Sequence, residues 1–144
     1  MFRKSIVAAL GGFVLVSTVN GDQMKSATTP LESIRFEADG DVKCLQSAVE
    51  AGDPVTGPST IILRAPPGCL VPWHFHTAQE QAVVIQGTVK MEMSDSPAMS
   101  LGPGGFAAMP GKVPHQFTCD RKAACLIMVW FDGKYDITWG RGSK

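Results

Sequence analysis

The chain contains only three histidines, and two of them, His74 and His76, are separated by a single residue. Successive side chains of an extended segment point to opposite faces. Both imidazoles would then lie on one face, with Trp73 and Phe75 on the other. Neutral imidazole is a common metal ligand. If residues 70–76 are extended, this spacing predicts a metal-chelating pair.

Two further residues could complete a metal site. Glu80 begins the next apolar run, and a short bend at Thr77 and Ala78 would turn its carboxylate toward the same interior. His115 follows Pro114 at the head of a more distant run. Three imidazoles and one carboxylate would leave open positions on a metal ion, which a catalytic metal needs. Two histidines with one carboxylate also form the ligand set of non-haem iron oxygenases. A structural role could explain one histidine alone, but it explains the set poorly.

Residues near the predicted ligands suggest an apolar wall. Val89, Met91 and Met93 would face inward from one strand. Phe117 and Cys119 follow His115 at even spacing, so they should face inward with it. Methionine is adaptable and suits a binding surface, whereas plain core filling is the better interpretation of Val89. The candidate pocket residues are therefore Met91, Met93, Phe117 and Cys119.

Four cysteines allow two disulfides in an oxidising compartment, with more than one pairing. Cys119 and Cys125 flank a turn-like stretch and could face each other across a hairpin. Cys119 could instead be a metal ligand or an oxidation-prone neighbour of the ion. Alternatively, some or all of the cysteines, including Cys44 and Cys69, are small buried apolar residues. Their spacing does not decide between these interpretations.

The elements that must position these residues are short strands. Apolar and β-branched runs are separated by Gly, Pro and Asp, which predicts an all-β sandwich or barrel. No internal repeat is present, so one barrel is expected. Residues 43–51 fit either a strand or one helical turn. The other expected strands are residues 60–63, 82–85, 88–93, 106–109, 117–119 and 125–131.

Residues 68–87 match the pattern G-x5-H-x-H-x3-E-x6-G at every defined position. A second pattern, G-x5-P-x-G-x2-H-x3-N, is matched in part by Gly104, Pro110 and His115, with Lys112 in place of Gly and Cys119 in place of Asn. Together they resemble the two motifs of the cupin superfamily, in its small single-domain cupin-2 form, with likeness to quercetin dioxygenases.

The resemblance implies a double-stranded β-helix, or jelly-roll barrel, that holds one divalent transition metal: iron, manganese, copper, zinc or nickel. The implied ligands are His74, His76, Glu80 and His115, and Glu80 could also act as the catalytic base. Dioxygenase-like chemistry on a small organic molecule is the expected activity, although isomerase and decarboxylase chemistry fit the same ligands. The alternatives are a non-catalytic protein of the periplasm that binds or senses a metal or small ligand, and a structural domain whose ligand set is vestigial.

The N-terminus has the three parts of a secretory signal peptide: Arg3 and Lys4, an apolar run, and small residues before a cleavage site after Gly21. The run is short for a membrane anchor. We therefore expect an exported protein, periplasmic or secreted, without a stable anchor after processing. The expected parts are a signal peptide (residues 1–21), a lead-in (22–39), the barrel (40–140) and a tail (141–144).

The charge of the chain excludes one class of partner. Basic and acidic residues are equal in number, and loss of the signal peptide would leave two more acidic than basic residues. No basic footprint for nucleic acid remains. The expected partner is a small-molecule substrate or ligand. By analogy with other cupins we also expect a homodimer that pairs through barrel edges.

Overall fold

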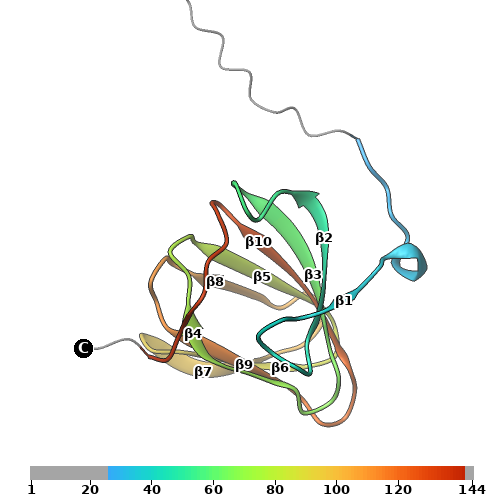
Figure 1. The fold of residues 1–144 in the computed structure, drawn as a ribbon. Coiled ribbons are helices and arrows are strands. Elements are labelled where there is room, and N and C mark those ends of the chain that lie inside the picture. The colour runs from blue at the N-terminus through green and yellow to red at the C-terminus, as the bar shows by residue number, and fades with distance from the viewer. Residues whose placement is uncertain (1–25, 142–144) are drawn as a thin grey trace, which may run out of the picture.

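The computed structural model describes residues 26–141. Two antiparallel β-sheets face each other and form a jelly-roll barrel, as the sequence predicted (Figure 1). The six-stranded sheet has the order β1 (Glu37–Ala38), β2 (Gln46–Gly52), β3 (Ser59–Ala65), β10 (Cys125–Phe131), β5 (Glu80–Gln86) and β8 (Phe106–Met109). The five-stranded sheet has the order β11 (Thr138–Trp139), β4 (Leu70–Phe75), β9 (His115–Cys119), β6 (Val89–Met93) and β7 (Ser96–Leu101).

The segments outside the barrel are short. A 3-10 helix, η1 (Leu31–Ser33), and β1 occupy the described part of the expected lead-in. The predicted signal peptide lies outside the described residues. No helix within residues 26–141 is both long and apolar enough to cross a membrane.

The strands form because apolar and polar residues alternate along them. In β9, the buried residues are His115, Phe117 and Cys119, whereas the two residues between them are half-buried. In β5, Glu80 and Ala82 are buried in the same alternating way. A period of two places one set of side chains on the inner face of each sheet. The inner faces of the two sheets therefore supply both the core and the polar residues predicted to do chemistry.

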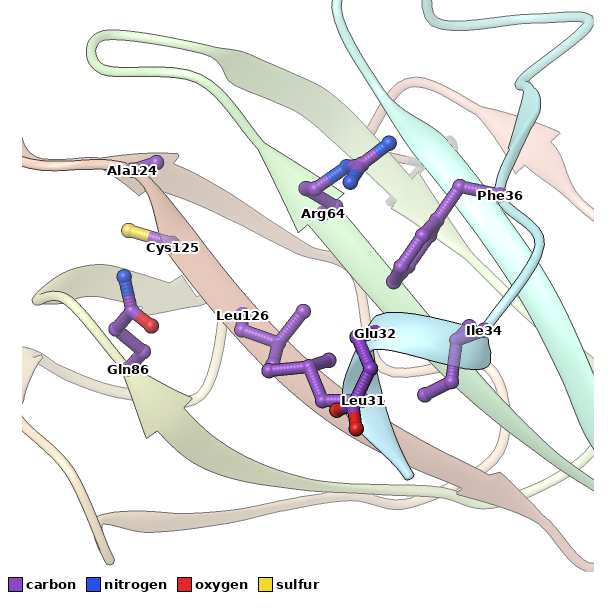
Figure 2. Close-up of a pocket in the computed structure, with 9 residues that line it drawn as sticks. All are labelled: Leu31, Glu32, Ile34, Phe36, Arg64, Gln86, Ala124, Cys125 and Leu126. Carbon is purple, nitrogen blue, oxygen red and sulfur yellow. The ribbon is translucent and has the colours of Figure 1, made fainter. Parts of the chain in front are cut away.

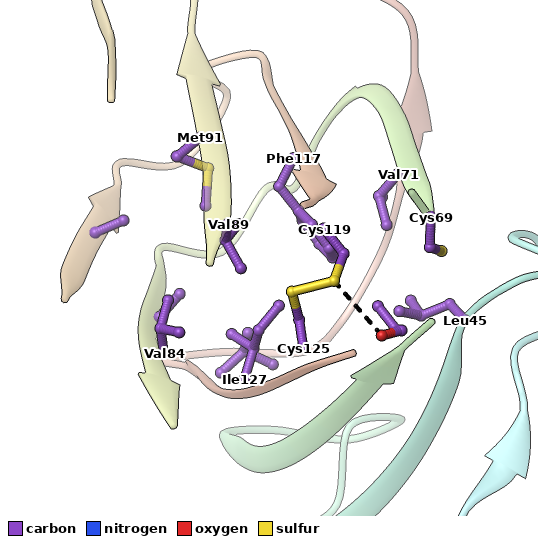
Figure 3. Close-up of a cluster of buried hydrophobic side chains, with 14 of the residues drawn as sticks. Leu45, Cys69, Val71, Val84, Val89, Met91, Phe117, Cys119, Cys125 and Ile127 are labelled. Carbon is purple, nitrogen blue, oxygen red and sulfur yellow. Dashed lines mark hydrogen bonds between the residues drawn. A yellow bond between two sulfur atoms is a disulfide. The ribbon is translucent and has the colours of Figure 1, made fainter. Parts of the chain in front are cut away.

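The apolar core lies between the two sheets. Val84, Val89 and Ile127 pack around a disulfide that joins Cys119 to Cys125 (Figure 3). Val89 is 1% exposed, in agreement with its interpretation as core filling. Removal of this apolar surface from water is the main favourable contribution to folding.

All four cysteines are paired. Cys119 and Cys125 are bonded to each other, as the spacing allowed, but not across a hairpin: their disulfide closes the loop that passes the chain from β9 in one sheet to β10 in the other. Cys44–Cys69 joins the loop after β1 to the residue before β4. The pairing corrects the suggestion that Cys119 could be a metal ligand, because its sulfur is bonded to Cys125. It also fixes the loop of residues 39–45 against the strand that carries His74.

Most expected strands are present, with two informative differences. The ambiguous residues 43–51 resolve as a loop followed by β2. The strand β7 was not predicted, because Pro97 lies inside it and was interpreted as a strand breaker. β7 is at the edge of its sheet, where proline is tolerated because one side of the strand needs no hydrogen-bond partner.

Gly87, which closes the first motif, has a conformational reason to be glycine. Its φ is 80°, and a Cβ atom there would lie 2.6 Å from the carbonyl oxygen of Ala124. Any other residue would be strained and would clash with the loop between β9 and β10. This glycine allows the turn between β5 and β6, which passes the chain from one sheet to the other.

The outer face of the six-stranded sheet carries the N-terminal segment. Phe36 receives the guanidinium of Arg64 over its ring at 4.1 Å, and Leu31 lies beside Leu126 of β10 (Figure 2). These residues border a hollow of about 420 Å³ that contains none of the histidines. The chemistry-bearing residues lie inside the barrel, between the inner face of this sheet and that of the five-stranded sheet.

Candidate metal centre

The three histidines lie at neighbouring positions of the five-stranded sheet. β4 and β9 are antiparallel, and their register places His74 directly opposite His115. His76 follows β4 immediately and, as the alternation predicted, is buried like His74, whereas Phe75 between them is only half-buried. The ring centroids of His74 and His115 are 4.3 Å apart, and those of His74 and His76 are 5.0 Å apart.

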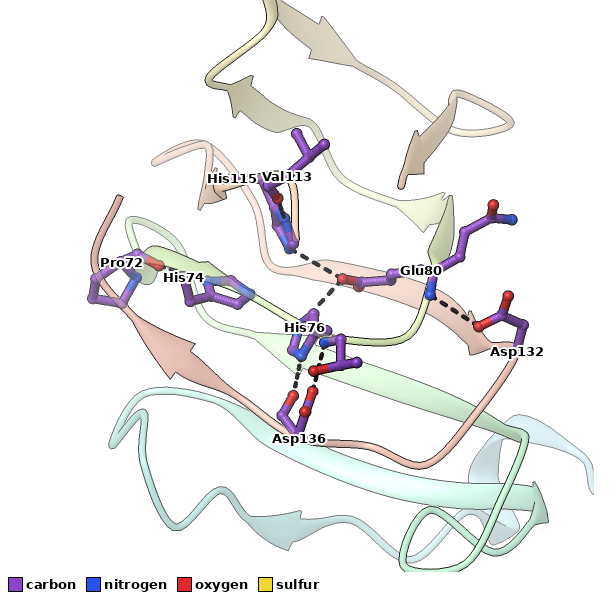
Figure 4. A network of polar contacts seen from close by, with 10 residues as sticks. Pro72, His74, His76, Glu80, Val113, His115, Asp132 and Asp136 are labelled. Carbon is purple, nitrogen blue, oxygen red and sulfur yellow. Dashed lines mark hydrogen bonds and ion pairs between the residues drawn. The ribbon is translucent and has the colours of Figure 1, made fainter. Parts of the chain in front are cut away.

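Glu80 reaches these imidazoles from the opposite sheet. The chain bends at residues 77–78, as expected, and Glu80 becomes the first residue of β5. Its Oε2 atom lies 3.1 Å from Nε2 of His115 and 3.4 Å from Nε2 of His76 (Figure 4). One ligand atom from each of the four residues lies within 4.8 Å of the others, and all four residues are buried. The cluster therefore bridges the two sheets.

Backbone carbonyl groups fix the orientation of all three imidazoles. Nδ1 of His74 donates to the carbonyl oxygen of Pro72 at 2.6 Å, and Nδ1 of His115 donates to that of Val113 at 2.9 Å. Nδ1 of His76 donates to the carbonyl oxygen of Asp136. A carbonyl only accepts, so each Nδ1 carries the proton and each Nε2 presents a lone pair. Such partners set the tautomer that a metal-binding histidine needs.

The loop at residues 110–114 supports this arrangement. Gly111 lets it approach the bend after His76, since a Cβ atom there would lie 2.4 Å from the carbonyl oxygen of Thr77. The backbone N–H of Lys112 donates to the carbonyl oxygen of His76 at 2.7 Å. Backbone contacts therefore hold the loop of the second motif against the bend of the first motif that follows His76.

Two atoms of the cluster are buried without a hydrogen-bond partner: Oε2 of Glu80 and Nε2 of His115. Buried polar atoms left unpaired are costly and rare in folded proteins. A metal cation would satisfy both, because a carboxylate oxygen and an imidazole nitrogen are each good ligands for divalent transition metals. The residues present therefore fit a metal ion.

The electrostatics favour the metal-binding forms of His74 and Glu80, whereas at His76 they favour the protonated form. Burial lowers the pKa of His74 to about 4, although the Pro72 carbonyl partly opposes this, so its ring is neutral near pH 7. Burial would raise the pKa of Glu80, but the adjacent imidazoles of His115 and His76 outweigh burial and hold the pKa below its ordinary value. Glu80 is therefore a carboxylate. Burial also lowers the pKa of His76, but Glu80 outweighs that effect and raises it above 6.5.

The loop between β10 and β11 contributes residues that the sequence analysis did not single out. Oδ1 of Asp136 accepts the N–H of Thr77 at 2.7 Å, and Oδ1 of Asp132 accepts the N–H of Gln79 at 2.9 Å (Figure 4). These bonds hold both ends of the bend that connects His76 to Glu80. The turn dipeptide Asp132-Gly133 and the segment 135–139, which resembles the end of small cupins, were visible in the sequence, but neither indicated these distant partners.

A cavity of about 310 Å³ adjoins the cluster and has His74, His76 and Glu80 in its wall. Phe117 lines it, in agreement with the prediction. Tyr135, on the loop between β10 and β11, also lines it and stacks near His76, with ring centroids 5.2 Å apart. Burial and the surrounding carboxylates raise the pKa of Tyr135, so its hydroxyl stays protonated.

Three other predicted pocket residues do not line this cavity. Met91 is buried in the apolar core, where β6 pairs with β9. Met93 packs against that core opposite His115. Cys119 is fully buried in its disulfide. These three residues face inward, as the alternation along their strands predicted. The cavity, however, opens on the β2–β3 side of the barrel, and β6 lies away from it.

The family model of the cupin domain matches residues 61–131, from β3 to the end of β10, and includes all four clustered residues. The chain belongs to the cupin superfamily. Within this cupin, the departure from the second motif at Lys112 has a structural counterpart. Lys112 has a φ of 67°, in the left-handed region that favours glycine, which is the residue that the motif has there.

Solved structures share the barrel of this cupin at low sequence identity. The polyketide cyclase RemF from Streptomyces resistomycificus has a TM-score of 0.70 and 17% identity, with 83% of this chain and 89% of that chain covered. An RmlC-like cupin from Shewanella frigidimarina NCIMB 400 has a TM-score of 0.65 and 16% identity over 79% and 96% of the two chains. KdgF from a Halomonas species has a TM-score of 0.62 and 16% identity over 75% and 94%. At this identity the likeness shows the fold alone.

No curated protein matches the cupin in sequence. Its activity must therefore be inferred from the cluster and the cavity beside it.

Proposed function

We propose that this cupin is a metal-dependent enzyme that binds one divalent transition metal and acts on a small organic molecule. The proposed ligands are His74, His76, Glu80 and His115. The observation that carries the proposal is the position of the cluster: three of its four residues form part of the wall of a cavity. A purely structural metal is enclosed by its ligands, whereas a catalytic metal keeps a position open to substrate.

The chemistry follows from the ligand set and its surroundings. A bound divalent metal would supply Lewis acidity to an oxygen atom of a ligand in the cavity. The Nδ1 hydrogen bonds hold the imidazoles in place, and Glu80, ionised and beside two histidines, is the candidate base. Apolar residues such as Phe117 and Phe131 exclude water from the wall of the cavity. Dioxygenase-like chemistry is the subclass we propose, because two histidines and a carboxylate are the ligands of non-haem iron oxygenases.

We also propose that the protein works outside the cytoplasm. The apolar N-terminal segment supports this location, and so do the two disulfides, which are typical of proteins in oxidising compartments. The proposed metal is then whichever ion the chain meets when it folds after export.

The first experiment measures metal content. Protein recovered from its own compartment should contain about one divalent transition ion per chain by elemental analysis. His115→Ala should lose most of that metal, because one of four ligands is removed. The matched control is Gln116→Ala, since the neighbouring side chain points away from the cluster and bonds Glu92. Equal metal in the two variants would refute the site.

The second experiment separates catalysis from binding. The metal-loaded protein is mixed with candidate phenols and diketones, and oxygen uptake is recorded. An enzyme of the proposed subclass should consume oxygen with at least one compound, and His115→Ala should not. Tight ligand binding without turnover of any compound would favour the non-catalytic alternative, a binding or sensing protein.

A further inference from the structure

The cavity beside the candidate metal centre has two chemically different ends. Its buried end contains His74, His76 and Glu80. Where the cavity meets solvent, beside the exposed or half-buried Ser47, Val49 and Pro54, its edge includes Asp39, Gly40 and Asp41. We call these last three residues the rim. A ligand in the cavity would have one end at the metal centre and the other at the rim.

Between the two ends the cavity is apolar. Its wall is made by aliphatic and aromatic side chains from both sheets and from the loop before β11: Val42, Leu45, Ile61, Leu63, Val71, Phe117, Val129, Phe131 and Ile137. Ligand sites of this kind bury most of a small organic molecule and use few polar groups to orient it. The volume of about 310 Å³ is at the small end of such sites.

The charges of the wall all have one sign. Asp39, Asp41 and Glu80 are its only acidic residues, its other ionisable groups are the two histidines and the protonated Tyr135, and among the described residues no lysine or arginine lines it. Glu80 is next to the proposed metal, which would offset its charge. The two rim carboxylates have no such partner in the wall. The rim therefore carries an uncompensated negative charge.

The rim is held in place by the fold. Oδ1 of Asp39 accepts the N–H groups of Asp41 and Val42 at 2.9 and 2.7 Å, and its own N–H donates to the carbonyl oxygen of Leu45 at 3.0 Å. The Cys44–Cys69 disulfide then ties this loop to β4. The Asp39 carboxylate and the backbone of this loop are thus held in place relative to the strand that carries His74.

From this arrangement we propose that the rim is a charge filter: the cavity accepts organic ligands with an oxygen donor at one end, an apolar body, and no negative charge at the far end. The inference rests on the proposed metal centre, which would bind the oxygen donor. An anionic group at the far end would lie beside Asp39 and Asp41 and be repelled by their like charge, most strongly at low ionic strength because the rim meets solvent.

The test uses three catechols that share a metal-binding end and differ in the charge of a short tail: 4-ethylcatechol (neutral), dopamine (cationic) and 3,4-dihydroxyphenylacetate (anionic). Each is titrated calorimetrically into the zinc-loaded protein at low ionic strength. We expect the anionic catechol to bind about tenfold more weakly than the other two, and the difference to shrink in high salt.

The variants isolate the rim. Asp39→Asn combined with Asp41→Asn should bring the anionic catechol close to the neutral one, and asparagine keeps the oxygen acceptor that the loop needs. The matched control is Asp120→Asn, because Asp120 also accepts a turn N–H, from Lys122, but does not line this cavity. Its selectivity should equal that of the wild type.

The outcomes separate the two proposals. Zinc-loaded protein that binds all three catechols equally, prefers the anionic one, or binds none would overturn the charge filter and leave the metal centre intact. Protein that takes up no zinc by elemental analysis would overturn the proposed function and the filter together.

Discussion

Asp136 contacts the proposed metal ligands from a distant part of the chain. The Nδ1 acceptors of His74 and His115 lie two residues away in sequence, whereas that of His76 is the carbonyl of Asp136, sixty residues away. The Asp136 carboxylate also accepts the N–H of Thr77. The orientation of His76 therefore depends on a tertiary contact, which a substitution can weaken without removing a ligand.

We expect Asp136→Ala to weaken zinc affinity about tenfold, as loss of a partner behind a metal ligand usually does. The loop would lose its bond to Thr77, and the Asp136 carbonyl would hold His76 less firmly. Asp136→Asn, which keeps an oxygen acceptor, should restore most of the affinity in competition titrations with a chelator. Asp120→Ala removes a similar turn contact elsewhere and should leave zinc affinity unchanged. An equal loss in both alanine variants would point to general destabilisation.

Protons should compete with the metal at His76. Burial lowers the pKa of this imidazole, but Glu80 and the Asp136 carbonyl raise it above 6.5 overall. A raised pKa means that the metal-free site holds a proton more tightly than a free imidazole does, and a metal ion must displace that proton. Zinc occupancy at fixed free zinc should therefore fall as the pH is lowered, and the fall should begin at a higher pH than it would for an imidazole with the ordinary pKa. Elemental analysis after dialysis at a series of pH values measures it, and a flat profile would contradict it.

At this scale the sequence predicted the four clustered residues but not the residues that support them. His74, His76, Glu80 and His115 were recognisable because the residues near each follow a local spacing. Asp132, Tyr135 and Asp136 were not, because their partners are more than fifty residues away and depend on where the last loop crosses the barrel. Two aspartates and a tyrosine in a turn-rich segment have no local signal of such a role.

The loop between β8 and β9 carries a strained residue. Lys112 is the only non-glycine residue with positive φ in the described part of the chain, and its N–H bonds the carbonyl oxygen of His76. A side chain in this region costs about 1–2 kcal/mol. Glycine would remove that cost, but its greater backbone freedom would stabilise the unfolded state by about 0.4–1 kcal/mol.

We therefore expect Lys112→Gly to raise the free energy of unfolding by up to about 1 kcal/mol. The measurement is the urea midpoint at constant m-value. Lys122→Gly is the matched control, because Lys122 is an exposed turn residue without positive φ and has no strain to relieve. It should lower stability by about 0.4–1 kcal/mol. A loss of similar size at both positions would show that the conformation of Lys112 is not strained.

Strands were predictable where alternation was strong and uncertain where it was weak. β5, β9 and β10 have clear inner faces, and their expected and observed bounds nearly coincide. β7 has no buried residue, because it is an edge strand that covers little of the core. Its existence depends on pairing with β6, through Val89 and Met91 among others. A strand that is stabilised mainly by pairing with its neighbour has no alternation of apolar and polar residues from which it could be predicted.

At the scale of the molecule, the cluster connects the two sheets. The three histidines come from β4, the residue after it, and β9 in one sheet, and Glu80 comes from β5 in the other. Their convergence could be predicted only with the family motif, because spacing fixes which face a residue occupies but not which strands oppose each other. The closure of the barrel brings these faces together and creates a site that the unfolded chain lacks.

Metal binding should therefore stabilise the whole fold. An ion that binds only the folded chain adds about 2.7 kcal/mol at a free concentration of about 100 times its dissociation constant. For a domain of this size that corresponds to a rise in Tm of roughly 10 °C. We expect this rise when zinc is added to chelator-treated protein followed by thermal unfolding. Gln116→Ala should show the full shift and His115→Ala almost none, because only His115 is in the cluster. Equal shifts in the two variants would mean that zinc stabilises the protein from another site.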